Sequence, residues 1–158
     1  MEGRIKPDVR YVDKSYYFAA CGNLLWEIEK LMSSNSLKFD SLVAIAKGGL
    51  IVGAYLAFKL EMPLDVVYAQ SYKGTEQGEL TVMIPDHIAL TGKTYLLVDD
   101  LYHTGRTLRT VRKKMEPART IPVVLFRKKE TGFFLVDQFA GYTKSWIQFF
   151  YEKEVLRV

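Results

Sequence analysis

The sequence predicts an α/β fold with a mainly parallel, twisted sheet that is flanked by helices. Three apolar runs, residues 41–46, 95–98 and 121–126, show no polar alternation, as expected for strands that are buried on both faces of a parallel sheet. A polar loop and a helical pattern follow each of the first two runs. This repetition of strand, loop and helix is typical of α/β proteins. The length of 158 residues predicts a single domain, 1–158.

The composition narrows the classes of function. The net charge of +4 and the isoelectric point near 9.1 suit an acidic ligand, such as a substrate with several phosphate groups. No dense run of Lys and Arg with interleaved aromatics favours nucleic acid. The single cysteine, Cys21, cannot form an internal disulfide and is interpreted as a core residue. No apolar run resembles a membrane span or a signal peptide, so we expect a cytoplasmic location.

The first segment, 1–13, is interpreted as an extended or irregular basic arm around Pro7. Its basic side chains are either simply solvated or contact a partner. Residues 15–32 are predicted to form a scaffold helix with Ser15 as its N-cap, and 33–36 a loop that ends it. The apolar stripe of this helix has helical spacing; it consists of Leu24, Leu25, Ile28, Leu31 and Met32.

A second strand, loop and helix unit begins with the apolar run 41–46 and continues as a helix over 50–60. Between them lie Lys47, Gly48 and Gly49. Paired glycines expose backbone N–H groups to an anion and Lys47 adds a positive charge, but a tight turn that needs glycine torsions explains the same residues.

Two strands with a polar loop between them are predicted next. After Pro63, residues 64–70 and 80–84 have strand character, and the glycine-bearing run 71–79 connects them. This pattern indicates either a mobile flap or a plain exposed hairpin.

The stretch 95–108 carries the most chemical information. Its apolar start is followed by Asp99 and Asp100, then by the turn 103–107, which opens an amphipathic helix that runs to about Met115. Turn N–H groups and a helix N-terminus favour phosphate, and paired carboxylates suit a ribose diol and Mg²⁺. The alternative is an ordinary buried strand followed by a capped helix.

The last third of the chain predicts strands at 121–126 and within 133–142, and a final stretch at 145–152. The basic cluster 127–132 follows a core strand directly, so it lies at the carboxyl edge of the sheet, where ligands bind in open α/β folds. A solvated basic loop is the alternative interpretation. Trp146 and Ile147 offer flat apolar surface that could hold a base, unless they belong to a core edge strand.

The stretch 95–108 resembles the phosphoribosyl pyrophosphate (PRPP) signature of the type I phosphoribosyltransferases: four apolar residues, two acids and a Thr-Gly-x-Thr loop. The segment Ala-Lys-Gly-Gly-Leu, 46–50, resembles the pyrophosphate loop of members that use 6-oxopurines. The resemblance extends from about 41 to 152 and implies the type I phosphoribosyltransferase fold. It also implies a flexible hood loop at 71–80 and a base-binding hood segment at 133–158.

The resemblance implies a purine salvage enzyme that transfers the phosphoribosyl group from PRPP to hypoxanthine, guanine or xanthine and releases pyrophosphate. The relatives have a non-proline cis peptide after the basic residue of the pyrophosphate loop, which predicts one at Lys47–Gly48. The implied site residues are His103, Asp99 and Asp100 for catalysis; Asp99 and Asp100 for metal; Thr104, Gly105, Arg106 and Thr107 for the 5′-phosphate; Lys47, Gly48, Gly49, Ser71 and Tyr72 for pyrophosphate; and Lys128, with Lys129 as a fallback, Trp146 and Ile147 for the purine.

The implied cofactor is Mg²⁺, and the implied assembly is a homodimer or homotetramer without membrane or nucleic-acid partners. Two departures from the pattern stand out. Phe150 replaces a proline in the C-terminal segment, where Tyr151 and Glu152 keep the aromatic and acidic positions. His103 stands where the relatives have an aspartate that acts at the purine N7.

His103 leaves three readings open. A neutral histidine could accept a proton near neutral pH, or the change could alter the choice of base or abolish catalysis. The main alternative function is a non-catalytic regulator that senses PRPP or a nucleotide on the same fold. A third possibility, a hydrolase on the same fold, is not favoured, because the sequence shows no nucleophile with a nearby base.

Overall fold

The computed structural model describes residues 9–71, 78–128, 138–142 and 145–152, and its centre is a mostly parallel sheet. The strands of this sheet are β2 (Ser41–Ala46), β3 (Leu64–Ser71), β4 (Leu80–Met83), β5 (Thr94–Tyr102), β6 (Arg119–Arg127) and β7 (Gln138–Tyr142). Their order is β4-β3-β2-β5-β6-β7, and only the β3–β4 pair is antiparallel. The predicted fold class is therefore confirmed, and all the predicted strands are present.

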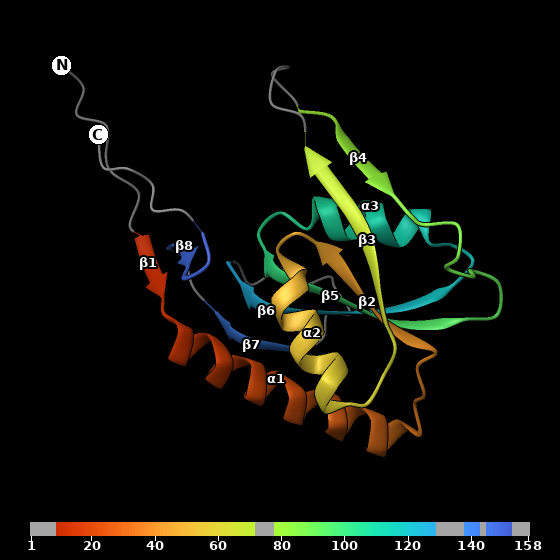
Figure 1. Cartoon of the computed structure of the whole chain (residues 1–158), viewed down its shortest axis with the longest axis horizontal. Helices are drawn as coiled ribbons and strands as arrows, with labels where there is room; N and C mark the ends of the chain where they lie inside the picture. The colour runs from red at the N-terminus through yellow and green to blue at the C-terminus, as the bar shows by residue number, and fades with distance from the viewer. Residues whose placement is uncertain (1–8, 72–77, 129–137, 143–144, 153–158) are drawn as a thin grey trace.

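Helices cover both faces of the sheet (Figure 1). On one face lie α1 (Lys14–Asn35) and α2 (Gly49–Lys59), and on the other lies α3 (Arg106–Lys114). Successive residues of β5 serve the two faces in turn, because side chains alternate along a strand. Leu96 packs with the α1 and α2 side, whereas Leu97 packs with the α3 side. This double burial explains the continuous apolar runs.

The first helix differs from the prediction at both ends. It begins at Lys14, and its N-cap is Asp13, whose carboxylate accepts a hydrogen bond from the Tyr16 N–H at 2.8 Å. The predicted N-cap, Ser15, lies inside the helix. The C-terminal end extends to Asn35 because polar side chains there bond to carbonyls one turn back, as Asn35 does with Leu31 O at 3.0 Å. The predicted loop at 33–36 is thus mostly helical.

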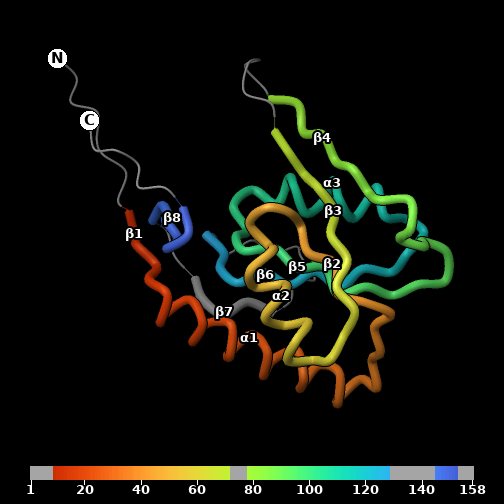
Figure 2. The backbone as a smooth tube through the Cα atoms, viewed as in Figure 1, coloured from red at the N-terminus to blue at the C-terminus, as the bar shows by residue number. Residues whose placement is uncertain are grey.

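A second, two-stranded sheet joins distant parts of the chain. Strand β1 (Val9–Val12) runs parallel to β8 (Trp146–Phe149), and the two lie side by side in Figure 2. Within the predicted basic arm, residues 9–12 are therefore extended, and residues 1–8 lie outside the described part. Val12 and Phe149 are both buried, which joins this small sheet to the core beside α1.

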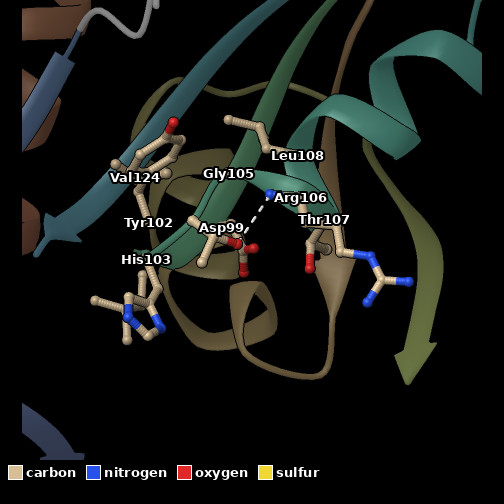
Figure 3. A pocket seen from close by; sticks show the side chains of 10 residues that line it. Asp99, Tyr102, His103, Gly105, Arg106, Thr107, Leu108 and Val124 are labelled. Atoms are coloured by element: carbon tan, nitrogen blue, oxygen red, sulfur yellow. Dashed lines mark hydrogen bonds between the residues drawn. The ribbon is translucent and has the colours of Figure 1, made fainter. Parts of the chain in front are cut away.

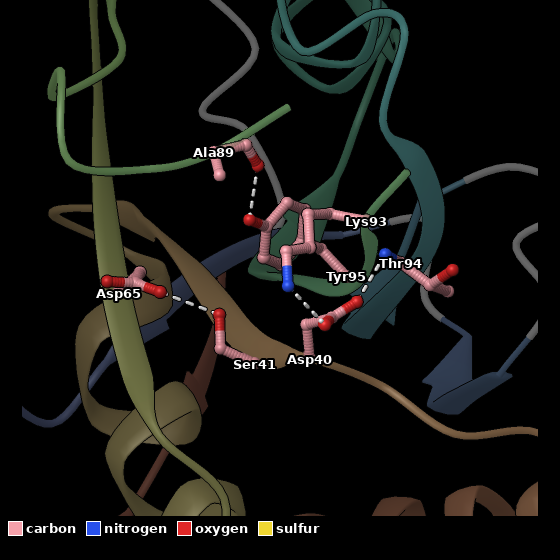
Figure 4. Close-up of polar contacts among 7 residues, drawn as sticks. All are labelled: Asp40, Ser41, Asp65, Ala89, Lys93, Thr94 and Tyr95. Atoms are coloured by element: carbon pink, nitrogen blue, oxygen red, sulfur yellow. Dashed lines mark hydrogen bonds and ion pairs between the residues drawn. The ribbon is translucent and has the colours of Figure 1, made fainter. Parts of the chain in front are cut away.

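The amino edge of the large sheet is tied by polar contacts that are remote from the carboxyl edge (Figure 4). Asp40 accepts hydrogen bonds from the Thr94 N–H at 2.8 Å and from Lys93 Nζ at 3.0 Å. Ser41 Oγ donates to Asp65 Oδ2 at 2.6 Å. The Asp40 contacts hold the start of β5 beside the start of β2, and the Ser41 contact joins β2 to β3. Over the residues described, no helix is long and apolar enough to cross a membrane.

Candidate active site

The carboxyl edge of the sheet brings the predicted site segments together. The ends of β2, β5 and β6 are neighbours in the sheet, and they lead into residues 47–49, 99–107 and 127–128. This is the edge at which open α/β sheets bind ligands, because loops converge there and helices begin there.

The turn after β5 borders a cavity of about 80 Å³, which is lined by Asp99, Leu101, Tyr102, His103, Thr104, Gly105, Arg106, Thr107, Leu108 and Val124. All five residues of the predicted turn 103–107 are thus at this cavity. In Figure 3, Asp99 and Thr107 face the cavity, and the Arg106 guanidinium extends away from His103. Helix α3 starts at Arg106, so its first N–H groups lie at the cavity and favour an anion.

Gly105 has a structural requirement for glycine. Its φ of 76° lies in the left-handed region, and a Cβ there would collide with the Tyr102 ring. The Arg106 N–H donates to Thr104 Oγ1 at 3.3 Å, which keeps the loop tight. The turn therefore presents backbone donors and the Thr104 and Thr107 hydroxyls around one small cavity.

The two carboxylates at the end of β5 have different surroundings. Asp99 lines the cavity, and its Oδ1 accepts a hydrogen bond from the Asp100 N–H at 2.9 Å. Asp100 accepts a hydrogen bond on Oδ2 from the Tyr151 hydroxyl at 2.8 Å. Burial, helped by the charge of Asp100, raises the pKa of Asp99 well above its usual value. Burial also raises the pKa of Asp100, although the Tyr151 hydroxyl opposes that shift.

The Lys47–Gly49 turn lies against the acidic pair. A Cβ on Gly48 would be 2.5 Å from both carboxylate oxygens of Asp100, and one on Gly49 would be 2.5 Å from Val98 O. Glycine is therefore required at both positions, because neighbouring atoms of β5 approach the loop too closely to leave room for a side chain. The structure contains a non-proline cis peptide in this loop, but at Ala46–Lys47. The predicted position, Lys47–Gly48, was wrong by one residue: the cis bond precedes the lysine.

Lys128 and Trp146 come together from different elements. Lys128 Nζ lies 4.2 Å from the centroid of the Trp146 ring, a cation–π contact. The Lys128 side chain is mostly buried, and this burial lowers its pKa. The backbone N–H of Lys128 donates to Tyr102 O at 2.9 Å, which places Lys128 beside the cavity-lining turn. Trp146 is half exposed.

Ile147 does not share the surface of Trp146. It is 3% exposed and packs in the core cluster with Val12 and Phe149. Adjacent residues of a strand point to opposite faces, so β8 can present only one of the two to a ligand. For Ile147 the structure therefore agrees with the alternative interpretation, a residue of a core strand, whereas Trp146 stays exposed.

The remaining predicted site residues are only partly described. Ser71 ends β3 and pairs with Leu80 of β4, so the predicted strands on both sides of the 71–80 loop are present. Tyr72 and Lys129 lie outside the described residues. The 133–158 segment is described only at 138–142 and 145–152.

Tyr151 was not predicted as a site residue. Its hydroxyl contacts Asp100 across a large sequence separation. The only signal in the sequence was its position in the pattern of an aromatic residue before Glu152, a pattern that does not reveal which side chain the hydroxyl meets.

Comparisons with known proteins agree with this geometry. Residues 12–146 match the family model of the phosphoribosyl transferase domain. The xanthine-guanine phosphoribosyltransferase of Chromohalobacter salexigens is 42% identical over 115 residues, which cover 70% of this chain and 67% of that protein. The enzyme of the same name from Idiomarina loihiensis is 31% identical over 116 residues, which cover 71% of this chain and 70% of that protein.

Among solved structures, the purine phosphoribosyltransferase of Pyrococcus horikoshii superposes with a TM-score of 0.77 and 27% identity, covering 92% of this chain and 95% of that one. The family model spans most of the chain, including β5 with its acidic pair and the loop that begins α3. The chain therefore belongs to the phosphoribosyltransferase family.

Proposed function

We propose that this protein is a purine salvage phosphoribosyltransferase, which transfers the phosphoribosyl group of PRPP to a ring nitrogen of hypoxanthine, guanine or xanthine. One observation carries the proposal: the acidic pair and the 103–107 turn lie between Lys47–Gly49 on one neighbouring strand end and Lys128 on the other. This order along the edge matches a substrate with a pyrophosphate, a phosphorylated ribose and a base. The names of the relatives support the same reaction class.

In this reaction the bond from C1′ to the pyrophosphate oxygen breaks and a bond from C1′ to the purine nitrogen forms, while that base loses a proton. The 103–107 turn would hold the 5′-phosphate through backbone N–H groups and the hydroxyls of Thr104 and Thr107. Asp99 and Asp100 would orient the ribose hydroxyls. Lys47 and the N–H groups of Gly48 and Gly49 would hold the pyrophosphate as its charge grows.

The purine would stack on Trp146 and accept a hydrogen bond from Lys128 at its 6-oxygen. Lys128 lies over the Trp146 ring, so a base that stacks on the same face of this ring would displace the ammonium. His103, exposed at the rim of the cavity, is the candidate acceptor for the purine proton. The remaining task is to position charge around a sugar that becomes positively charged in the transition state.

The residues fit Mg²⁺ as the cofactor. Asp99 and Asp100 supply carboxylate oxygens, whereas no cluster of three or more His, Cys, Asp or Glu side chains occurs among the described residues. Such a donor set suits Mg²⁺, which commonly binds through one or two carboxylates and takes its other ligands from substrate oxygens and water. When bound, the ion would neutralise charge on the departing pyrophosphate.

The proposal extends to a cytoplasmic homodimer or homotetramer. Exposed apolar side chains on α2, β3 and β4 support self-association; they are Phe58, Tyr68 and Met83. Light scattering of the purified protein would measure the mass, and a monomer at micromolar concentration would contradict this part of the proposal.

A chromatographic assay tests the reaction directly. The protein is incubated with PRPP, Mg²⁺ and one base at a time: hypoxanthine, guanine, xanthine or adenine. We expect a nucleotide product with at least one 6-oxopurine and none after chelation of the metal. Folded protein that binds PRPP but forms no product with any of the four would favour the sensing regulator instead.

A further inference from the structure

Tyr151 contacts the acidic pair, although the reaction scheme above gives it no role. Its hydroxyl donates to Asp100 Oδ2 at 2.8 Å, whereas its backbone follows β8. Because Asp100 is a candidate ligand for ribose or metal, this contact acts on a group whose direction matters for catalysis.

The backbone that carries Tyr151 is firmly fixed. The Phe150 N–H donates to Val12 O at 3.0 Å, and the Glu152 N–H donates to Phe149 O at 3.0 Å. The Glu152 carboxylate closes the same turn by accepting a hydrogen bond from the Phe149 N–H at 2.9 Å.

The Tyr151 ring is equally constrained. It stacks on Phe149 with centroids 5.3 Å apart and planes 10° apart, and it meets Tyr17 edge to face at 5.8 Å. A phenol held in this way can orient its acceptor, since little side-chain freedom remains to be lost when the hydrogen bond forms.

Asp100 is also restricted on another side. The Gly48 backbone approaches its carboxylate so closely that a Cβ would be 2.5 Å from both oxygens. The carboxylate therefore lies between the candidate pyrophosphate loop and the Tyr151 hydroxyl, and loss of the hydroxyl removes one of these two constraints.

We propose that Tyr151 is a positioning residue for the transfer reaction: its hydroxyl holds Asp100 in the orientation that receives PRPP. This inference rests on the proposed function. Tyr151 itself exchanges no proton and contacts no reacting atom; it acts through Asp100.

The variant Tyr151→Phe tests the inference because it keeps the ring contacts and removes only the donor. We expect the Kd for PRPP, measured by calorimetry with Mg²⁺ present, to rise about tenfold, in keeping with a lost hydrogen bond to a charged group. The KM for the purine should change less than twofold, because Lys128 and Trp146 are untouched. Circular dichroism should show a folded protein.

Tyr16→Phe is the matched control. Its phenol oxygen accepts a hydrogen bond from the Arg10 guanidinium at 2.7 Å, and its ring also stacks on a phenylalanine, Phe126, with centroids 6.0 Å apart. This bond does not involve Asp100, so the control variant should bind PRPP as the wild type does.

A double-mutant cycle with Asp100→Asn separates positioning from a general structural effect. If Tyr151 acts through Asp100, Tyr151→Phe should weaken PRPP binding much less in the Asn background than in the wild type. Equal losses in both backgrounds, or wild-type affinity in Tyr151→Phe, would overturn the inference. Failure of the proposed function would look different, because the wild type would then form no nucleotide with any of the bases, whether or not it binds PRPP.

Discussion

The Lys128 ammonium lies 4.2 Å from the centre of the Trp146 ring, although the two residues come from elements of different sheets. Lys128 follows β6 of the large sheet, whereas Trp146 begins β8 of the small one. This contact joins a hydrogen-bond donor and a stacking surface, which are the two elements that recognition of an oxopurine needs.

Replacement of Trp146 by alanine should weaken binding of the base. Loss of a stacking surface costs about 1–3 kcal/mol per base in other systems, so we expect the purine KM to rise about tenfold or more while the KM for PRPP changes little. Steady-state kinetics with each substrate varied in turn would measure this. Trp26→Ala is the control, since Trp26 is also exposed and also lies beneath a lysine, Lys30 at 4.9 Å, but on α1. Equal effects of the two variants would argue against a role for Trp146 in base binding.

Gly48→Ala should abolish most of the activity. The new Cβ would be 2.5 Å from both Asp100 oxygens, so either the loop or the carboxylate has to move. Misplacement of about 1 Å can cost about 100-fold in rate, and we expect a loss of that order in kcat/KM.

The control for this substitution is Gly22→Ala in α1, where the nearest atom to the new Cβ, Tyr55 Oη, is 3.9 Å away. That variant should keep full activity and gain about 0.5–1 kcal/mol in stability, because alanine suits a helix interior better than glycine. Thermal denaturation would detect the gain. Wild-type kcat/KM in Gly48→Ala would show that this close approach is unimportant for catalysis.

If His103 accepts the purine proton, the rate should fall at acid pH, because the protonated ring cannot act as a base. His103→Gln should lose about 100-fold in kcat and also lose that acidic limb. The control is His87→Gln, because His87 binds Asp65 at 3.1 Å near the opposite edge of the sheet. A wild-type rate that does not fall at acid pH would argue against His103 as the base.

Asp40 should make stability depend on pH. Hydrogen bonds from the Thr94 N–H and Lys93 lower the pKa of this carboxyl below its usual value of about 3.9. Because the folded pKa is the lower one, the contribution of Asp40 is complete above about pH 4 and is lost as the pH falls through the folded pKa.

The variant Asp40→Asn should therefore be less stable than the wild type at pH 7, and the difference should shrink below about pH 4. Urea denaturation at several pH values would measure it. Asp86→Asn, at an exposed position on the β4–β5 connection, should follow the wild type throughout. A constant difference between Asp40→Asn and the wild type down to pH 2 would rule out this linkage.

The sheet and the phosphate loop could be predicted because their determinants are local. Residues 95–98 are apolar without alternation because β5 is covered on both faces. The turn at 103–107 is formed by consecutive residues, so its glycine and hydroxyl side chains can be recognised directly in the sequence. The cap of α1 was missed because Asp13 and Ser15 are both acceptable N-caps. The deciding fact was which N–H the side chain reaches, and that depends on where the helix starts.

The parts that could not be predicted depend on long-range geometry. Ile147 points into the core because β8 pairs with β1, and no local sequence pattern predicts this pairing. The contact between Tyr151 and Asp100 depends on the same pairing. The resemblance placed the cis bond after Lys47, whereas the structure has it before the lysine, at Ala46–Lys47.

The parallel pairing of β1 with β8 also bears on the order in which the protein can be completed during translation. Val9 pairs with Trp146, so β1, which is synthesised early, can form its sheet only after β8 has been synthesised. Until the ribosome has released residues 146–149, Val12 lacks its strand partner Phe149 and Trp146 has no scaffold. A nascent chain stopped before that point could have assembled β2, β5 and the phosphate loop, yet it would have no platform for a base.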